Sequence, residues 1–370
     1  MGLNWHSRGA SSKKTIQLRP SNSLINENEE NKKNTENIVN ISDNDSKDET
    51  EKNKITKISI DTNQKCSYNK TMENILVCRY HKKDIRSCII LKDRRIATCS
   101  DDELIIVYNS KTFKIDLKIK EHTNSVFQIL QLKSGILASS SKDTTIKLFN
   151  IKKNKYEILQ TLNDKFVPIY KIYELNNQKL LSCPYEVKDI GHIIVYSIKN
   201  DKYRKEYQIE TDGPSFNVIQ TKQNEICIED NKICFYDLFE QKVIIKLNNI
   251  KAAGNGCFNM IAKELLLITG DKTLYIINVI QHNLVRIIDA LDSGLICTST
   301  ILNENIILTG DNNHMIKLWR LKEDYLELIS IEINAHNSEV YELLKLENGN
   351  ILSGSRYGDI KIWQLKNIKI

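Results

Sequence analysis

The chain has 370 residues, a formal net charge of +6 and 41% apolar residues, enough for one large packed domain and an additional tail. It has no run of 18 apolar residues, and its N-terminus lacks the apolar core of a secretory signal, so we expect neither a transmembrane helix nor an exported precursor. The nine cysteines form no C-x-x-C pair, which favours a reducing compartment over a disulfide framework. We therefore expect an intracellular protein, located in the cytoplasm, with the nucleus as the alternative.

The N-terminal part differs in composition from the rest of the chain. Residues 1–72 are polar and low in complexity, and the stretch from Asn26 to Lys54 is almost free of apolar residues. Such a segment buries too little apolar surface to offset the conformational entropy that is lost on ordering. We predict a disordered tail over residues 1–72 and one folded domain over residues 73–370.

A pattern of four short expected strands recurs through residues 73–370. Each unit can be anchored on the last residue of its third expected strand, and successive anchors lie 41, 47, 40, 41, 42 and 44 residues apart. In three units a histidine stands 27 residues before the anchor, which chance does not readily produce. The pattern therefore predicts seven structural repeats, whose anchors are Tyr108, Phe149, Tyr196, Tyr236, Ile277, Trp319 and Trp363.

This repeat resembles that of the WD-repeat family, in which about 40–45 residues form one four-stranded propeller blade. The resemblance implies an all-β fold, a seven-bladed β-propeller of four-stranded antiparallel blades preceded by the disordered tail. It also implies that the strand before His81 completes the last blade, because joining both chain ends in one blade closes the ring. Units three to five match the family pattern least well.

In that family, a histidine near the unit start, a serine or threonine on the second strand, an aspartate in the next turn and the terminal tryptophan form a hydrogen-bonded set. Tyr357 stands where unit seven should have the aspartate. A Ser–His–Asp combination is also compatible with a catalytic triad, but it recurs here at the blade spacing, so we favour the structural role. The resemblance places the sets at His81, Thr98, Asp102 and Tyr108 in unit one, at His122, Ser139, Asp143 and Phe149 in unit two, and at His336, Ser353 and Trp363 in unit seven.

The resemblance further implies that partners bind one face of the ring, where the unit-start segments and the turns between second and third strands emerge. Aromatic and arginine side chains most often dominate the binding energy of protein interfaces. Packing between blades is the alternative role for the aromatic residues, and a solvated surface is the alternative for the arginines. The candidate binding residues are Asp84, Arg86, Asp101, Phe127, Lys142, Tyr170, Glu339, Tyr341 and Arg356, with Phe216 as a less certain match.

We expect a non-catalytic scaffold or adaptor that binds proteins or peptides through this face. A ubiquitin-ligase substrate receptor is an alternative, although the tail shows no F-box-like helical block. A propeller enzyme, or a lipid or nucleic-acid binder, is an alternative of another class. No phosphate loop, metal-ligand spacing or dense basic stripe favours it. We therefore predict no catalytic residue, no metal and no cofactor, and we do not expect nucleic-acid binding.

Overall fold

The computed structural model describes residues 56–58, 72–163, 167–184, 191–230, 232–248, 250, 257–290, 294–322, 326–332 and 334–366. All of them belong to one compact unit, Lys52–Ile370. Except for residues 56–58, the predicted disordered tail up to residue 71 lies outside the described residues. The described residues form 29 strands and no helix.

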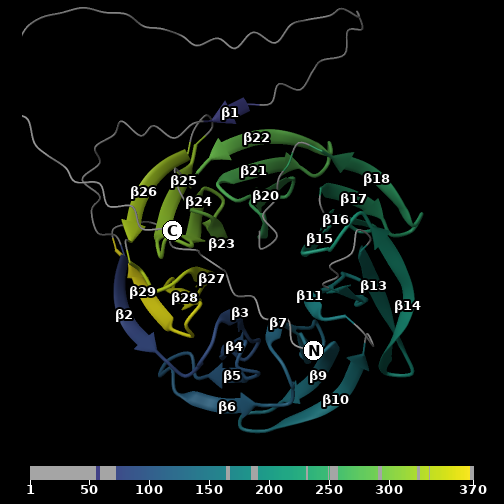
Figure 1. The fold of residues 1–370 in the computed structure, drawn as a ribbon, viewed down its shortest axis with the longest axis horizontal. Coiled ribbons are helices and arrows are strands. Elements are labelled where there is room, and N and C mark those ends of the chain that lie inside the picture. The colour runs from purple at the N-terminus through teal and green to yellow at the C-terminus, as the bar shows by residue number, and fades with distance from the viewer. Residues whose placement is uncertain are drawn as a thin grey trace, which may run out of the picture. The chain divides into compact units, whose positions relative to one another are not determined.

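Seven four-stranded antiparallel blades stand side by side in a propeller ring, which confirms the predicted fold class (Figure 1). Within each blade the strands are paired in chain order, because short turns join neighbouring antiparallel strands. Blade one contains β3 (Ile85–Ile90), β4 (Ile96–Ser100), β5 (Ile105–Tyr108) and β6 (Ile115–Ile119). Blade two contains β7 (Val126–Gln131), β8 (Leu137–Ser141), β9 (Thr145–Ile151) and β10 (Tyr156–Asn163). Blade three contains β11 (Ile169–Glu174), β12 (Leu180–Pro184), β13 (Gly191–Lys199) and β14 (Lys202–Thr211).

The remaining blades follow the same order around the ring (Figure 1). Blade four contains β15 (Asn217–Lys222), β16 (Glu225–Glu229), β17 (Ile233–Asp237) and β18 (Lys242–Leu247). Blade five contains β19 (Phe258–Met260), β20 (Leu265–Thr269), β21 (Thr273–Asn278) and β22 (Asn283–Asp289). Blade six contains β23 (Ile296–Asn303), β24 (Ile306–Asp311), β25 (Ile316–Leu321) and β26 (Leu326–Glu332). Blade seven contains β27 (Val340–Lys345), β28 (Ile351–Ser355) and β29 (Ile360–Leu365), and it takes its fourth strand from the other end of the domain.

That fourth strand is β2 (Met72–Cys78), which pairs antiparallel with β29. Asn74 lies opposite Trp363 and Cys78 lies opposite Ile360. The strand begins a few residues earlier than the sequence pattern suggested, but it closes the ring as predicted. Opening the ring would therefore expose the edge of β29 as well as the faces of the neighbouring blades.

An additional strand, β1 (Thr56–Ile58), pairs in parallel with β22 at the outer edge of blade five. The backbone of Lys57 lies opposite Ile287. This strand falls within the segment that we predicted to be disordered, so the prediction missed it. Three residues are too few to show the apolar alternation from which a strand can be predicted.

Packing between blades forms the hydrophobic core. One cluster joins Val107 of blade one to Val126, Ile129 and Phe149 of blade two, all of them buried. The second strand of a blade lies between its neighbours, and every residue of β8 is buried. Because each blade buries its apolar side chains against the next, this hydrophobic stabilisation depends on an intact ring.

The eight cysteines in the described part of the chain are free thiols. Six of them are buried, where a cysteine packs as a small apolar side chain.

Candidate functional site

The alternating strand directions place the turns of every blade on two opposite faces of the ring. We call upper face the one formed by the unit-start segments and the turns between second and third strands, such as residues 79–84 and 101–104. We call lower face the one formed by the turns between first and second strands and between third and fourth strands, such as residues 91–95 and 109–114.

Backbone hydrogen bonds hold the two kinds of upper-face segment together. The amide of Asp101 donates to the carbonyl of Asp84 at 3.0 Å, and in blade seven the amide of Arg356 donates to the carbonyl of Glu339 at 3.1 Å. Blade two has the equivalent bond from Lys142 to Ser125, at 2.9 Å. The repeated bond brings candidate residues that are 17 positions apart in the sequence to one surface.

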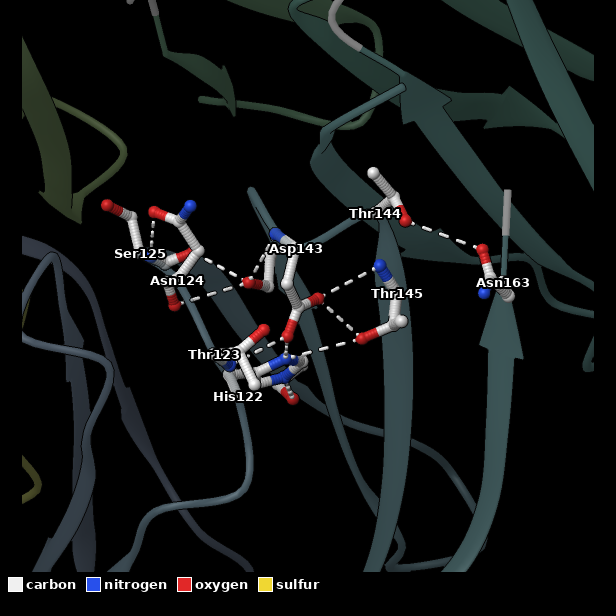
Figure 2. Close-up of polar contacts among 10 residues, drawn as sticks. His122, Thr123, Asn124, Ser125, Asp143, Thr144, Thr145 and Asn163 are labelled. Atoms are coloured by element: carbon white, nitrogen blue, oxygen red, sulfur yellow. Dashed lines mark hydrogen bonds and ion pairs between the residues drawn. The ribbon is translucent and has the colours of Figure 1, made fainter. Parts of the chain in front are cut away.

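Beneath this surface, His122 connects two segments of blade two (Figure 2). Its Nδ1 lies 2.7 Å from Oδ2 of Asp143, and its Nε2 lies 2.6 Å from the Ser139 hydroxyl. An ionised carboxylate only accepts hydrogen bonds, so Nδ1 carries the proton and Nε2 accepts from Ser139. Asp143 also accepts from the amides of Thr123 and Thr145, at 3.1 and 3.0 Å.

The surroundings of Asp143 favour its ionised form. Burial alone would raise the pKa of this carboxyl group, but the hydrogen bond and charge of His122 and the hydrogen bonds from Thr145 and the Thr123 amide outweigh burial. Its pKa is therefore held well below the ordinary value. The group acts as a fixed acceptor that joins the unit-start segment to the tight turn.

Unit one has the same arrangement. His81 Nδ1 lies 3.0 Å from Asp102, and its Nε2 lies 2.8 Å from Thr98 Oγ1. The Thr98 hydroxyl lies 3.4 Å from the phenol oxygen of Tyr108, the anchor residue of unit one. Burial would raise the pKa of Asp102, but His81 and two backbone amides outweigh burial and lower it.

Unit seven keeps part of the arrangement. The indole Nε1 of Trp363 donates to Ser353 Oγ at 2.7 Å, and this oxygen lies 2.6 Å from His336 Nε2. Nδ1 of His336 is buried and has no hydrogen-bond partner among the described residues. Burial first, and then the nearby charges of Lys361 and His314, lower the pKa of His336 to about 3.

This geometry does not favour hydrolytic chemistry at the Ser–His–Asp sets. Ser139 is fully buried, and both ring nitrogens of His122 are occupied within their own blade. A nucleophile must reach a substrate, and its base must be free to take up the proton. The described residues also contain no group of three His, Cys, Asp or Glu residues that could hold a metal ion.

The charged candidates form one cluster across blades one and seven. Arg86 on β3 donates from Nε and Nη2 to the two oxygens of Asp101, at 2.9 and 2.5 Å, and Nη2 lies 3.4 Å from Asp84. In blade seven, Arg356 Nη1 donates to Glu339 at 2.6 Å. Arg356 Nε lies 3.8 Å from Asp84 and so connects the two blades.

The guanidinium group of Arg86 also covers an aromatic ring. Its Cζ lies 5.5 Å from the ring centre of Tyr341 on β27, within the range of a cation–π contact. Burial would lower the pKa of Arg86, but Asp101 and Asp84 outweigh burial and raise it, so the charge is fixed. The bidentate hydrogen bonds to Asp101 hold the Arg86 side chain in one orientation.

The aromatic candidates continue the surface over the following blades. The rings of Phe127 on β7 and Tyr170 on β11 have their centres 5.4 Å apart. The ring of Tyr170 lies 6.0 Å from that of Phe216, which precedes β15, in an edge-to-face arrangement. The structure thus brings the candidates together in an arc that runs from Arg356 to Phe216, and only Lys142 has no described side-chain contact within it. We call this set of residues the upper-face arc.

Two charged residues of the ring centre were not among the candidates. Lys171 and Glu342 directly follow Tyr170 and Tyr341 on the first strands of their blades, and they interact electrostatically across the ring. Burial raises the pKa of Glu342 to about 7, despite the opposing charge of Lys171 and a backbone hydrogen bond from Cys88. Lys171 and Glu342 each follow a candidate aromatic residue, so their position on the first strand was a signal that could have identified them. Their interaction joins distant blades, and no sequence pattern predicts it.

The fold and this arc define a seven-bladed propeller whose upper face presents fixed aromatic and guanidinium groups. No family model matches the chain. Among curated proteins, the chain is similar to cell division control protein 4 of Saccharomyces cerevisiae, with 33% identity over 75 residues. That match covers 20% of this chain and 10% of the yeast protein. No helix of the described residues has the length and apolar character needed to cross a membrane.

Proposed function

We propose that the protein is a non-catalytic scaffold of the WD-repeat type, which binds a protein or peptide through the upper-face arc. The observation that carries this proposal is the gathering of these side chains along five neighbouring blades, blade seven and blades one to four. Tyr341 and Arg86 stack at one end, and Phe127, Tyr170 and Phe216 contact one another at the other. The yeast relative is consistent with it but covers too little of the chain to name a partner.

The arc has the physical properties of a binding site for a protein segment. Its aromatic rings offer large rigid surfaces that lose little conformational entropy on binding. Arg86 is held by Asp101 before any partner arrives, so the orientation of its guanidinium group costs little at the moment of association. Arg356 has a half-exposed side chain and is available at the rim.

Affinity purification from cells tests the proposal, with the variant Phe127→Ala, Tyr341→Ala, Arg356→Glu. A control variant, Ile158→Ala, Leu159→Ala, Arg204→Glu, likewise truncates two large side chains and reverses one charge, but on exposed outer strands. We expect the arc variant to lose specific partners and the control variant to keep them, provided that both melt like the wild type.

Partners that persist on the arc variant would contradict this site. A ubiquitin-ligase substrate receptor is the alternative. Ligase subunits, which would not dock on the arc, would then be found with both wild type and arc variant, whereas the substrates would be lost from the variant. An enzymatic role would replace it if turnover survived the arc variant and disappeared with a single serine or histidine change.

A further inference from the structure

The lower face has one recurring position at which the blades differ in a systematic way. It lies three residues after the third-strand anchor, where the chain reaches the lower end of the third strand. Five units have a lysine there: Lys111, Lys152, Lys199, Lys322 and Lys366. Units four and five, which are neighbours in the ring, have Phe239 and Ile280 instead (Figure 1).

Both apolar side chains protrude into solvent. Phe239 is 77% exposed and Ile280 is 50% exposed. In the neighbouring blade three, Ile198 lies near the end of β13, opposite Tyr203, and is 48% exposed. Two neighbouring blades therefore present a large apolar side chain from a lower-face turn, and packing within the ring explains neither.

Side-chain hydrogen bonds give the two turns a defined shape. Asp237 Oδ1 accepts from the amides of Phe239 and Glu240, both at 2.8 Å. Asn278 Oδ1 accepts in the same way from Ile280 and the next residue, both at 2.9 Å. The two turns thus hold their apolar side chains in equivalent positions on adjacent blades.

A polar contact between blades four and five fixes the turns relative to each other. His282, in the turn that carries Ile280, has its Nε2 2.9 Å from Oε2 of Glu225, the first residue of β16. Lys222 donates to the same carboxylate oxygen at 3.0 Å. The side chains of Glu225 and His282 are 8% and 18% exposed, so the contact between the two blades joins largely buried groups.

The adjoining part of the lower face, in blades one to three, is strongly basic. Among the exposed residues of its described turns, only Asp93 and Asp201 are acidic. By contrast, the upper-face turn of blade one contains three acidic residues in succession, residues 101–103. None of the exposed lysines of the third-to-fourth turns in these blades makes a described ion pair: Lys111, Lys114, Lys152, Lys153, Lys155 and Lys199.

We propose that the lower face docks on an anionic lipid bilayer, with Phe239 and Ile280 entering the interfacial region and the lysines of blades one to three facing the lipid headgroups. Dispersed, flexible lysines suit a diffuse anionic surface, which requires no stereospecific match. Apolar tips beside them add burial in the boundary between headgroups and acyl chains. An aliphatic side chain such as Ile280 gains this burial from lipid, whereas it cannot stack on the bases of a nucleic acid.

This role is independent of the upper-face arc and compatible with it. The two sets of turns lie on opposite faces, so a bilayer-docked molecule would present the upper-face arc away from the lipid. Loss of lipid binding and loss of protein partners can therefore be measured separately, on different variants.

Cosedimentation of the full chain with lipid vesicles tests the proposal. The vesicles contain phosphatidylcholine alone or with phosphatidylserine. We expect binding only to the anionic vesicles, and weaker binding at high salt because salt screens exposed charges. The variant Lys152→Glu, Lys153→Glu, Lys155→Glu should bind at least about tenfold more weakly, since each lysine near an anionic surface adds to the attraction.

A matched variant separates the lower face from net charge. Lys82→Glu, Lys83→Glu, Lys120→Glu makes the same charge change with exposed upper-face lysines and should keep vesicle affinity within about threefold of the wild type. Phe239→Ala with Ile280→Ala should weaken binding several-fold and make the remainder more sensitive to salt. Phe239, Ile280 and all the substituted lysines are exposed, so we expect every variant to melt like the wild type.

Three outcomes would overturn the proposal. The wild type would fail to bind phosphatidylserine vesicles, or the two lysine variants would lose affinity equally, or the chain would bind duplex DNA or an acidic protein but no vesicle. If the triple lysine variant melted early, the single change Lys153→Glu would serve in its place, with Lys83→Glu as its control.

Discussion

Tyr357 stands 21 residues after His336, the position that Asp143 has relative to His122, and Nδ1 of His336 is buried with no hydrogen-bond partner in the described part of the chain. Trp363 donates to Ser353, so the serine hydroxyl proton is free to point at Nε2 of His336. The imidazole then carries its own proton on Nδ1, where no described acceptor receives it. Unit seven therefore has an incomplete hydrogen-bond chain within the blade that closes the ring.

Tyr357→Asp should complete that chain and stabilise the protein. A carboxylate at this position can accept from His336 Nδ1, and a hydrogen bond to a charged group contributes about 1.5–3 kcal/mol. The pKa of His336 should rise from about 3, because the new negative charge favours the imidazolium form.

Thermal unfolding measures the gain in stability, and NMR titration measures the pKa of His336. Tyr357→Ala is the control, since Tyr357 is 67% exposed and its loss alone should matter little. Equal melting temperatures for the two variants would contradict the explanation.

Asp143→Ala should destabilise the domain by about 2–4 kcal/mol. The change removes an acceptor shared by His122, Thr145 and the amide of Thr123, and takes the carboxylate partner from the buried ring of His122 (Figure 2). Denaturant unfolding measures the loss. Lys142→Ala, at the preceding exposed position of the same turn, is the matched control and should change stability by less than about 0.5 kcal/mol. Equal losses for both variants would mean that the turn itself, and not the carboxylate, is responsible.

The sequence was informative wherever a feature repeats. The 27-residue distance from histidine to anchor predicted three units, and the near-constant period supplied the other four, although units three to five lack most of the hydrogen-bonding residues. The strand before His81 could be placed in the last blade because it occupies the same position relative to its histidine as β6 does in the next unit. Periodicity carries this information because each blade is one structural repeat that packs against its neighbours in the same way.

Features that occur once or join distant units could not be predicted. The approach of Lys171 to Glu342 and the pairing of β1 with β22 depend on the ring as a whole. The contact of Arg86 with Tyr341 joins residues that are 255 positions apart in the sequence. Similarly, the lysines of the lower face are dispersed in the sequence, one or a few per unit, and therefore form no basic stripe until the turns meet on one surface.

Deleting residues 73–80 should cause loss of soluble protein, whereas deleting residues 1–65 should leave the melting temperature nearly unchanged. The first deletion removes most of β2 and exposes the edge of β29, together with buried Trp363. The second removes only β1 of the described strands, which pairs over three residues at an outer edge. Expression followed by thermal unfolding measures both. A shorter deletion, residues 1–55, keeps β1 and serves as the control for its contribution. Similar behaviour of the two longer deletions would contradict the closure of the ring by β2.

The stability of the domain should decrease as the pH rises from about 5 to about 8, because two carboxyl groups with raised pKa values in the folded protein, Glu342 and Glu229, then ionise. Burial raises the pKa of Glu342 to about 7 in the folded protein, against an ordinary value near 4.5, and Lys171 opposes this only in part. Burial likewise raises the pKa of Glu229 to about 7, although Asn217 donates a hydrogen bond to it. A carboxyl group whose folded pKa is raised binds its proton more tightly when folded, so its contribution to stability is complete at low pH and is lost as the pH passes the folded pKa.

Asp102 and Asp143 affect stability in the opposite direction. Their pKa values are lowered in the folded protein, so their contribution to stability is present above about pH 4 and is lost in more acidic solution. We therefore expect maximum stability near pH 5. Glu342→Gln should flatten the decrease above pH 5 and leave the acidic limb unchanged. Urea unfolding at a series of pH values checks this, and an unchanged slope between pH 5 and 8 in Glu342→Gln would assign the dependence to other groups.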